Sequence, residues 1–123
     1  MIIKKVVFIV FLFSKRNRII KKAVAKTVCE FDGRTPKIYQ HFFYGAFDIE
    51  PQYLVVWYLF ETDAELELAK SSGYCEELER TTIQNLISLG YPQEVFELRQ
   101  MISFTTKEDI DNQANGDYHL YFQ

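Results

Sequence analysis

The sequence is poor in cysteine and glycine, and both shortages exclude classes of protein. Its two cysteines, Cys29 and Cys75, lie far apart with no CxxC pair, which argues against a disulfide framework and against a zinc site built from local ligand pairs. The five glycines are isolated, and no phosphate-binding loop, GxSxG elbow or HExxH motif occurs. These absences disfavour the common nucleotide-binding, hydrolase and zinc-protease classes, so no catalytic residue, metal or cofactor is predicted.

What the sequence does have is a strong supply of apolar and aromatic side chains. Of its 123 residues, 48% are hydrophobic, including 11 Phe, 8 Tyr and 1 Trp. This length and composition are typical of one globular domain with a core that needs no disulfide or metal. We expect a single domain over residues 1–123, with 1–14 as a segment that either joins the core or stays peripheral, and the cysteine usage fits a reducing cytoplasm.

Charge is divided unevenly along the chain. Residues 1–40 carry ten Lys or Arg against two acids, whereas residues 41–123 carry four Lys or Arg against fifteen acids. The two halves either neutralise each other within the fold or leave two opposed faces for partners.

The N-terminal 31 residues contain an apolar run followed by an amphipathic pattern. Residues 6–13 are all apolar, but no small-x-small site follows, and the run is far shorter than the ~20 residues of a spanning helix. We expect a buried strand there, with a membrane-proximal anchor or a loosely attached tail as alternatives. Residues 15–31 predict a helix with an apolar face opposite a lysine-rich face, ended by Asp32-Gly33.

The remaining pattern predicts an α+β fold. It is a two-layer arrangement with an antiparallel or mixed sheet of about four or five strands packed by helices, in the order (β)αββααβαβ. Two capping-box patterns mark helix starts, at residues 62–65 and 105–108. After the helix 15–31, the expected elements are strands at 37–47 and 53–61, helices at 62–71 and 75–89, a strand at 96–104, a helix at 105–115 and a strand at 117–123.

Several short motifs occur together in this order along residues 15–123. They are FDIEP at 47–51, WYLFETD at 57–63, GYP at 90–92, ISF at 102–104 and NGDY at 115–118. In order and spacing the chain resembles a family of small uncharacterised bacterial α+β proteins. The resemblance implies the same fold and carries no catalytic residue with it.

The leading functional hypothesis is a small cytoplasmic protein-interaction module, similar to immunity proteins, that presents an acidic surface to a basic protein partner. The expected contact residues are acids beside the apolar stripes of two helices. They are Glu76, Glu77, Glu79, Asp109 and Asp111. Homodimerisation is left open, and neither nucleic-acid binding nor a membrane span is expected.

Two alternatives come from other classes. One is an enzyme or small-molecule binder with an aromatic-lined pocket that uses His41 or His119, or a thiol at Cys75 in the first turn of a helix, where the dipole favours a thiolate. The other is a peripheral nucleic-acid or membrane binder acting through the basic helix 15–31. The acidic excess of the rest of the chain opposes binding to a polyanion.

Overall fold

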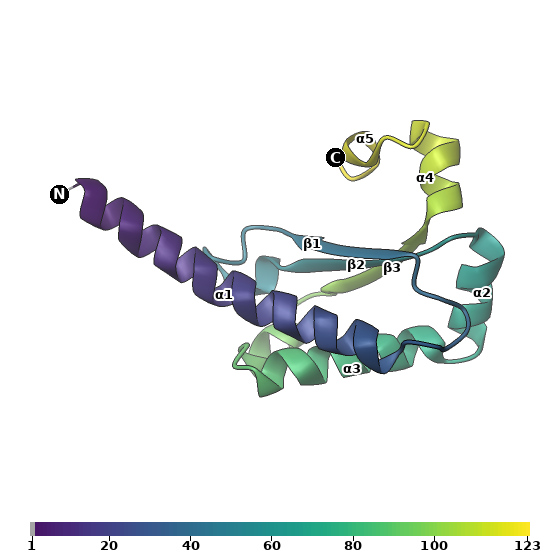
Figure 1. The fold of residues 1–123 in the computed structure, drawn as a ribbon, viewed down its shortest axis with the longest axis horizontal. Coiled ribbons are helices and arrows are strands. Elements are labelled where there is room, and N and C mark those ends of the chain that lie inside the picture. Colours follow the sequence, from purple (N-terminus) through teal and green to yellow (C-terminus); the bar gives the residue numbers. More distant parts are fainter. Residues whose placement is uncertain (1) are drawn as a thin grey trace.

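The computed structural model describes the backbone of residues 2–123 and the side chains of residues 15–123. It is an α+β fold in which helices pack on a small mixed sheet (Figure 1). The helices are α1 (Ile2–Glu30), α2 (Asp63–Ser71), α3 (Tyr74–Ser88), α4 (Lys107–Ala114) and α5 (Tyr118–Tyr121), with 3-10 turns η1 (Pro51–Tyr53) and η2 (Gln93–Glu97); the strands are β1 (Gln40–Tyr44), β2 (Val55–Phe60) and β3 (Ile102–Thr106).

The sheet has the order β1-β2-β3. β1 and β2 are antiparallel, with Phe42 opposite Trp57, as the short link between them predicts. β2 and β3 are parallel, and α2 and α3 form the crossover between them. The described residues therefore form three strands, fewer than the expected four or five.

Residues 6–13 were expected to form a strand, and that prediction is wrong because they lie within α1. No glycine or proline occurs before Gly33, so nothing interrupts the chain between the apolar run and the amphipathic segment. Helix propagation adds a hydrogen bond for each further residue, whereas a strand needs a partner strand. The side chains of residues 1–14 lie outside the described part, and so does their expected burial.

The C-terminal segment also differs from the sequence-based prediction. Residues 117–123 form α5 instead of a strand, because Asp117 caps the helix by accepting a hydrogen bond from the Leu120 amide. Tyr118 and Phe122 are spaced to fall on one helix face, and both rings pack near Phe42. The expected strand at 96–104 is divided between η2 and the later β3.

Both threonine-capped helices form where the sequence places them. Thr62 and Glu65 make the expected capping box at the start of α2. At α4 the cap is Thr106, whose hydroxyl accepts from the Asp109 amide, one residue later than the expected box. Because β2 and β3 are parallel and adjacent, these caps place the starts of α2 and α4 side by side.

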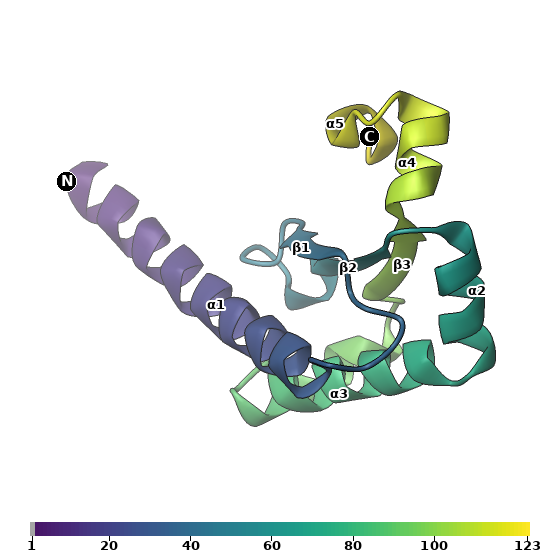
Figure 2. The same cartoon turned by 45° about the vertical axis from the view of Figure 1, so that its right-hand side comes forward.

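The core lies between one face of the sheet and helices α1 and α3 (Figures 1 and 2). Its fully buried side chains include Ile20, Val56, Tyr58, Leu78 and Leu86, and burying each contributes about 1.5–3 kcal/mol. The other face of the sheet carries an aromatic cluster, Phe42, Tyr44 and Trp57, which is covered by Phe122, the residue directly after α5.

Candidate functional site

The acids of α3 do not form a single uniform surface. Glu76 and Glu79 line a shallow hollow of about 330 Å³, together with Arg80, Ile83 and Gln84. Ile83 is half-buried and forms the apolar part of the hollow. The hollow therefore combines two carboxylates, one guanidinium and an aliphatic side chain.

Glu77 belongs to a different contact. Both of its carboxylate oxygens accept hydrogen bonds from Arg34, each at 2.8 Å, and the Arg34 guanidinium lies over the rings of Phe31 and Tyr74. The hydrogen bond from Arg34 lowers the pKa of Glu77, and the same bond raises the pKa of Arg34. Glu77 thus holds the loop after α1 against α3.

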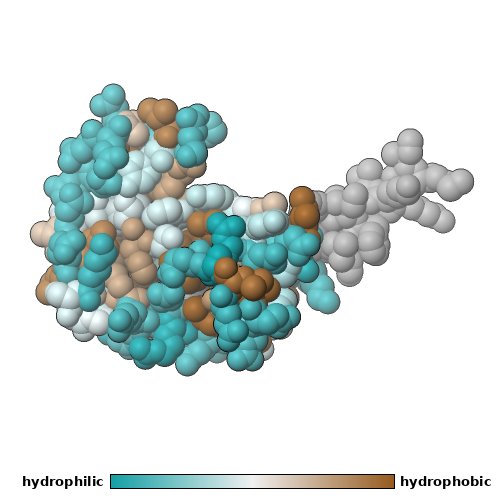
Figure 3. Space-filling model, turned by 180° about the vertical axis from the view of Figure 1, so that it is seen from behind, coloured by the Kyte–Doolittle hydropathy of each residue, from teal (hydrophilic) through white to brown (hydrophobic). Residues whose placement is uncertain are grey.

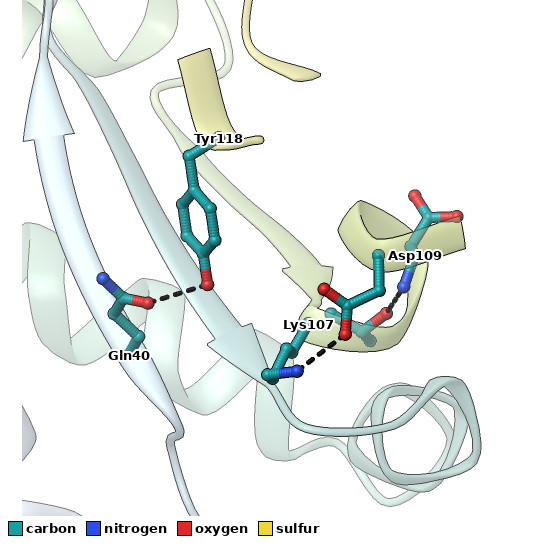
Figure 4. Close-up of polar contacts among 6 residues, drawn as sticks. Gln40, Lys107, Asp109 and Tyr118 are labelled. Carbon is teal, nitrogen blue, oxygen red and sulfur yellow. Dashed lines mark hydrogen bonds and ion pairs between the residues drawn. The ribbon is translucent and has the colours of Figure 1, made fainter. Parts of the chain in front are cut away.

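The two candidate acids of α4 are also engaged within the chain. Asp111 forms an ion pair with Lys107 at 2.6 Å (Figure 4). Asp109 accepts hydrogen bonds from Gln113 and Tyr121. Figures 1 and 2 place α4 on the opposite side of the sheet from α3. The structure therefore does not bring the five predicted contact residues together, and it leaves Glu76 and Glu79 as the pair that shares one hollow.

The histidines do not converge on a site. His41 reaches solvent from β1, with its ring 6.5 Å from that of Tyr58, and desolvation lowers its pKa. His119 is exposed on α5. Among the described residues, no group of three or more His, Cys, Asp or Glu side chains is arranged to hold a metal ion.

The setting of Cys75 does not favour a thiolate. Cys75 is buried in the first turn of α3, and burial raises its pKa to about 11, with Lys70 opposing and Glu79 adding to the rise. The desolvation of the sulfur outweighs the helix dipole. Cys29 is exposed near the end of α1.

Several aromatic residues pack against one another on the outer face of the sheet. Phe122 lies 4.9 Å from Trp57 and 5.1 Å from Phe42, measured between ring centroids. Trp57 also donates a hydrogen bond from its indole nitrogen to the Tyr44 hydroxyl. This cluster fastens α5 to the sheet, so its first role is structural.

In the described part of the structure, few ion pairs join the basic half of the chain to the acidic half. Among the described side chains, the Arg34–Glu77 pair is the ion pair that joins residues 1–40 to residues 41–123. Lys21, Lys22 and Lys26 are exposed on α1. The lower edge of the molecule in Figure 3, where α3 runs, is mostly hydrophilic. In that view the apolar side chains form separate patches among hydrophilic ones.

Sequence reasoning missed the non-acidic members of the α3 hollow, Arg80, Ile83 and Gln84. The signal was present, because positions 76, 80 and 84 and positions 79 and 83 are spaced by four residues on a helix. Ile83 is half-buried and packs against the core from the edge of the apolar face of α3, so it also reaches the hollow.

Comparison of the chain with family models, curated proteins and solved structures gives no match. The resemblance to a family of small bacterial α+β proteins therefore stays a prediction. Among the described residues, no helix has both the length and the apolar character needed to cross a membrane.

Proposed function

We propose that this protein is a small interaction module whose α3 hollow binds a basic segment of a partner protein. The observation that carries the proposal is the placement of Glu76 and Glu79 around the half-buried Ile83. A lysine or arginine side chain needs such a combination, since its aliphatic stem packs on an apolar surface while its charged head binds carboxylates.

The hollow also limits how a basic side chain enters. Arg80 lines it and repels a cation from its own end, so the incoming charge is directed to Glu76 and Glu79. Glu79 already accepts a hydrogen bond from the Gln100 amide at 3.0 Å, which holds its carboxylate in place and leaves capacity for a charged donor. The contact is therefore selective for position as well as for charge.

The uneven charge of the chain supports the same proposal. Acids that lack an internal cation contribute to a field that attracts a basic partner and speeds association by one to three decades at low salt. Masking of a basic site on a partner, as an immunity protein masks a toxin, is the kind of activity this surface suits.

The test uses fluorescently labelled short peptides rich in lysine or arginine and measures binding by anisotropy. We expect binding that weakens between about 50 mM and about 300 mM salt and falls at least about tenfold in the Glu76→Lys/Glu79→Lys variant. The matched control is Glu50→Lys/Glu61→Lys, which makes the same change in net charge at exposed positions outside the hollow.

An equal loss in both double variants would show attraction by net charge alone and would overturn the proposal. Binding of anionic vesicles or RNA that depends on Lys21, Lys22 and Lys26 would instead move the function to the basic face of α1.

A further inference from the structure

A second and more enclosed cavity lies where three segments of the chain meet. It measures about 270 Å³ and is bounded by α1, by the connection between β1 and β2, and by the segment that follows α3. These segments converge at the end of the sheet that lies beside the middle of α1 (Figure 1). Its size is just below the ~300–1,000 Å³ of pockets for drug-sized ligands, so it suits a small metabolite.

Opposite charges line this cavity from different segments. Lys15 and Arg16 come from α1, and Asp48 comes from the β1–β2 connection. Arg16 and Asp48 are close enough for the positive charge to act on the carboxyl group, yet no ion pair joins these two described side chains. The cavity occupies the space between them.

Arg16 is held in place by the protein and keeps donors free. One guanidinium nitrogen donates to the carbonyl of Phe47 at 2.5 Å, which anchors α1 to the residue before Asp48. A guanidinium has five N–H donors in a fixed plane, so groups suited to a carboxylate remain. Lys15 is exposed at the rim and adds a second positive charge.

Asp48 carries an unsatisfied hydrogen-bond acceptor. Its Oδ1 atom is shielded from solvent and has no hydrogen-bond partner among the described residues. Burial raises the pKa of Asp48, while the charge of Arg16 opposes the rise. A buried acceptor without a donor is unfavourable. Because Oδ1 is closed to solvent, a ligand in the cavity donates to it only after the Asp48 side chain turns, and that contact relieves the cost.

The remaining wall is mostly apolar. Tyr91 is buried, and its hydroxyl group donates a hydrogen bond to the carbonyl of Pro51. The hydroxyl proton is therefore not available to a ligand. Burial raises the pKa of Tyr91 to about 12, which keeps the ring neutral. Ile19 and Pro92 complete this side.

We propose that this cavity binds a small carboxylic acid that carries a hydroxyl or ammonium group on the carbon next to the carboxylate. Arg16 and Lys15 bind the carboxylate, and Asp48 accepts the hydrogen bond of the neighbouring donor. The ligand thereby bridges the two charges that the fold keeps apart. This activity is separate from the α3 hollow, which lies on another part of the surface.

The probes are the α-amino acids and the α-hydroxy acids glycolate, lactate and malate, titrated against the ¹⁵N-labelled full chain. Acetate and methylamine each supply one of the two groups and serve as controls. We expect at least one two-group acid to shift the Gly90 and Tyr91 amide signals saturably, with acetate and methylamine at least about tenfold weaker, since each forgoes one charge-assisted contact. No saturable shift with any acid of the panel, or acetate equal to the best of them, would overturn the proposal.

Variants test the carboxylate-binding side of the site, Arg16 and Lys15, separately from Asp48. Arg16→Gln is expected to weaken binding of every acid at least about tenfold, and Lys15→Gln to weaken it less because Lys15 stands at the rim. Since Arg16 also anchors Phe47, Lys15→Gln keeps the test valid if Arg16→Gln does not fold. Lys26→Gln, on α1 but outside the cavity, is the matched control and is expected to change nothing.

Asp48→Asn distinguishes the two ligand classes. The amide oxygen of asparagine still accepts a hydrogen bond from a hydroxyl group but carries no charge to balance an ammonium group. This variant is therefore expected to lose its affinity for amino acids and to keep its affinity for hydroxy acids. Unchanged affinity for an amino acid in Asp48→Asn, or unchanged affinity for all acids in both Arg16→Gln and Lys15→Gln, would contradict the assigned contacts.

Discussion

The guanidinium of Arg34 donates two hydrogen bonds, each 2.8 Å long, to the carboxylate of Glu77, and the two residues are 43 positions apart in the sequence. Arg34 follows the last turn of α1, and Glu77 lies in the first turn of α3. The pair therefore ties together the two helices that cover the inner face of the sheet. It also engages Glu77 within the chain, so that Glu76 and Glu79 are the acids of α3 that line the hollow.

The first prediction concerns the pH dependence of this pair. Arg34 lowers the pKa of Glu77 below its ordinary value of 4.5, so the stabilisation is present above that pH and is lost as the pH falls below it. Glu77→Gln is expected to lower the melting temperature at neutral pH, with the difference from the unaltered chain shrinking in acid. Thermal melts across this range check it. Glu76→Gln is the control, and a pH-independent difference for Glu77→Gln would contradict the pairing.

The second prediction concerns a buried polar contact between α1 and α3. The Asn85 side-chain amide donates to the Thr27 hydroxyl at 2.9 Å, and Thr27 donates in turn to the carbonyl of Ala23. Thr27→Val keeps the shape but leaves the buried amide without its acceptor, so we expect a loss of about 1–3 kcal/mol in the free energy of unfolding. Urea denaturation measures it, with Thr81→Val on α3 as the control. Adding Asn85→Leu to Thr27→Val is expected to cost less than the sum of the two single changes, and strict additivity would count against the contact.

The third prediction concerns stability at high pH. Tyr58 is fully buried on β2, and its hydroxyl lies 2.8 Å from that of Thr82. Burial raises its pKa from 10.0 to about 12, so the unfolded chain loses this proton first and stability declines as the pH rises between these values. Tyr58→Phe is expected to lose about 0.5–1.5 kcal/mol at neutral pH and to show a shallower alkaline decline. Urea titrations at several alkaline pH values measure the free energy of unfolding of both proteins. An equal decline in the unaltered chain and in Tyr58→Phe would disprove the prediction.

The fourth prediction concerns the attachment of α5. Phe122 contacts the rings of Phe42 and Trp57 on the sheet, and it is half-buried. Phe122→Ala is expected to cost about 1–3 kcal/mol, below the cost for a fully buried phenylalanine, and to expose Trp57 to water. A red shift of the Trp57 fluorescence together with urea denaturation checks both effects. Leu120→Ala, on the exposed side of the same helix, is the control and is expected to leave both unchanged.

Local chemistry explains which parts of the fold were predictable. The capping box at Thr62 and Glu65 and the end of α4 at Asn115 form where the sequence indicates, because hydrogen bonds within a few residues decide them. The prediction of a strand at 117–123 was wrong because a pattern of only seven residues fits a strand or a short helix equally well. The Asp117 cap favours the helix locally, and the packing of Phe122 on Trp57, which joins residues far apart in the chain, holds the segment on the sheet.

The candidate sites show the same division. The sequence identified Glu76 and Glu79 as acids on the outer side of a helix, since helical spacing alone is sufficient for that. It gave no sign that Glu77 between them would be bound by Arg34, nor that Arg16 and Asp48 would face one cavity.

By itself, the sequence determined the α+β class, the antiparallel pairing of β1 with β2, the helices from Thr62 to Ser88 and the separation of basic from acidic residues along the chain. These features follow from side-chain periodicity, capping and turn length, which act over a few residues. Only the tertiary structure decided the parallel pairing of β3 with β2 and the convergence of α1, the β1–β2 connection and the segment after α3 around a cavity. Those outcomes depend on contacts between distant segments, whose energies become available only when the chain is folded.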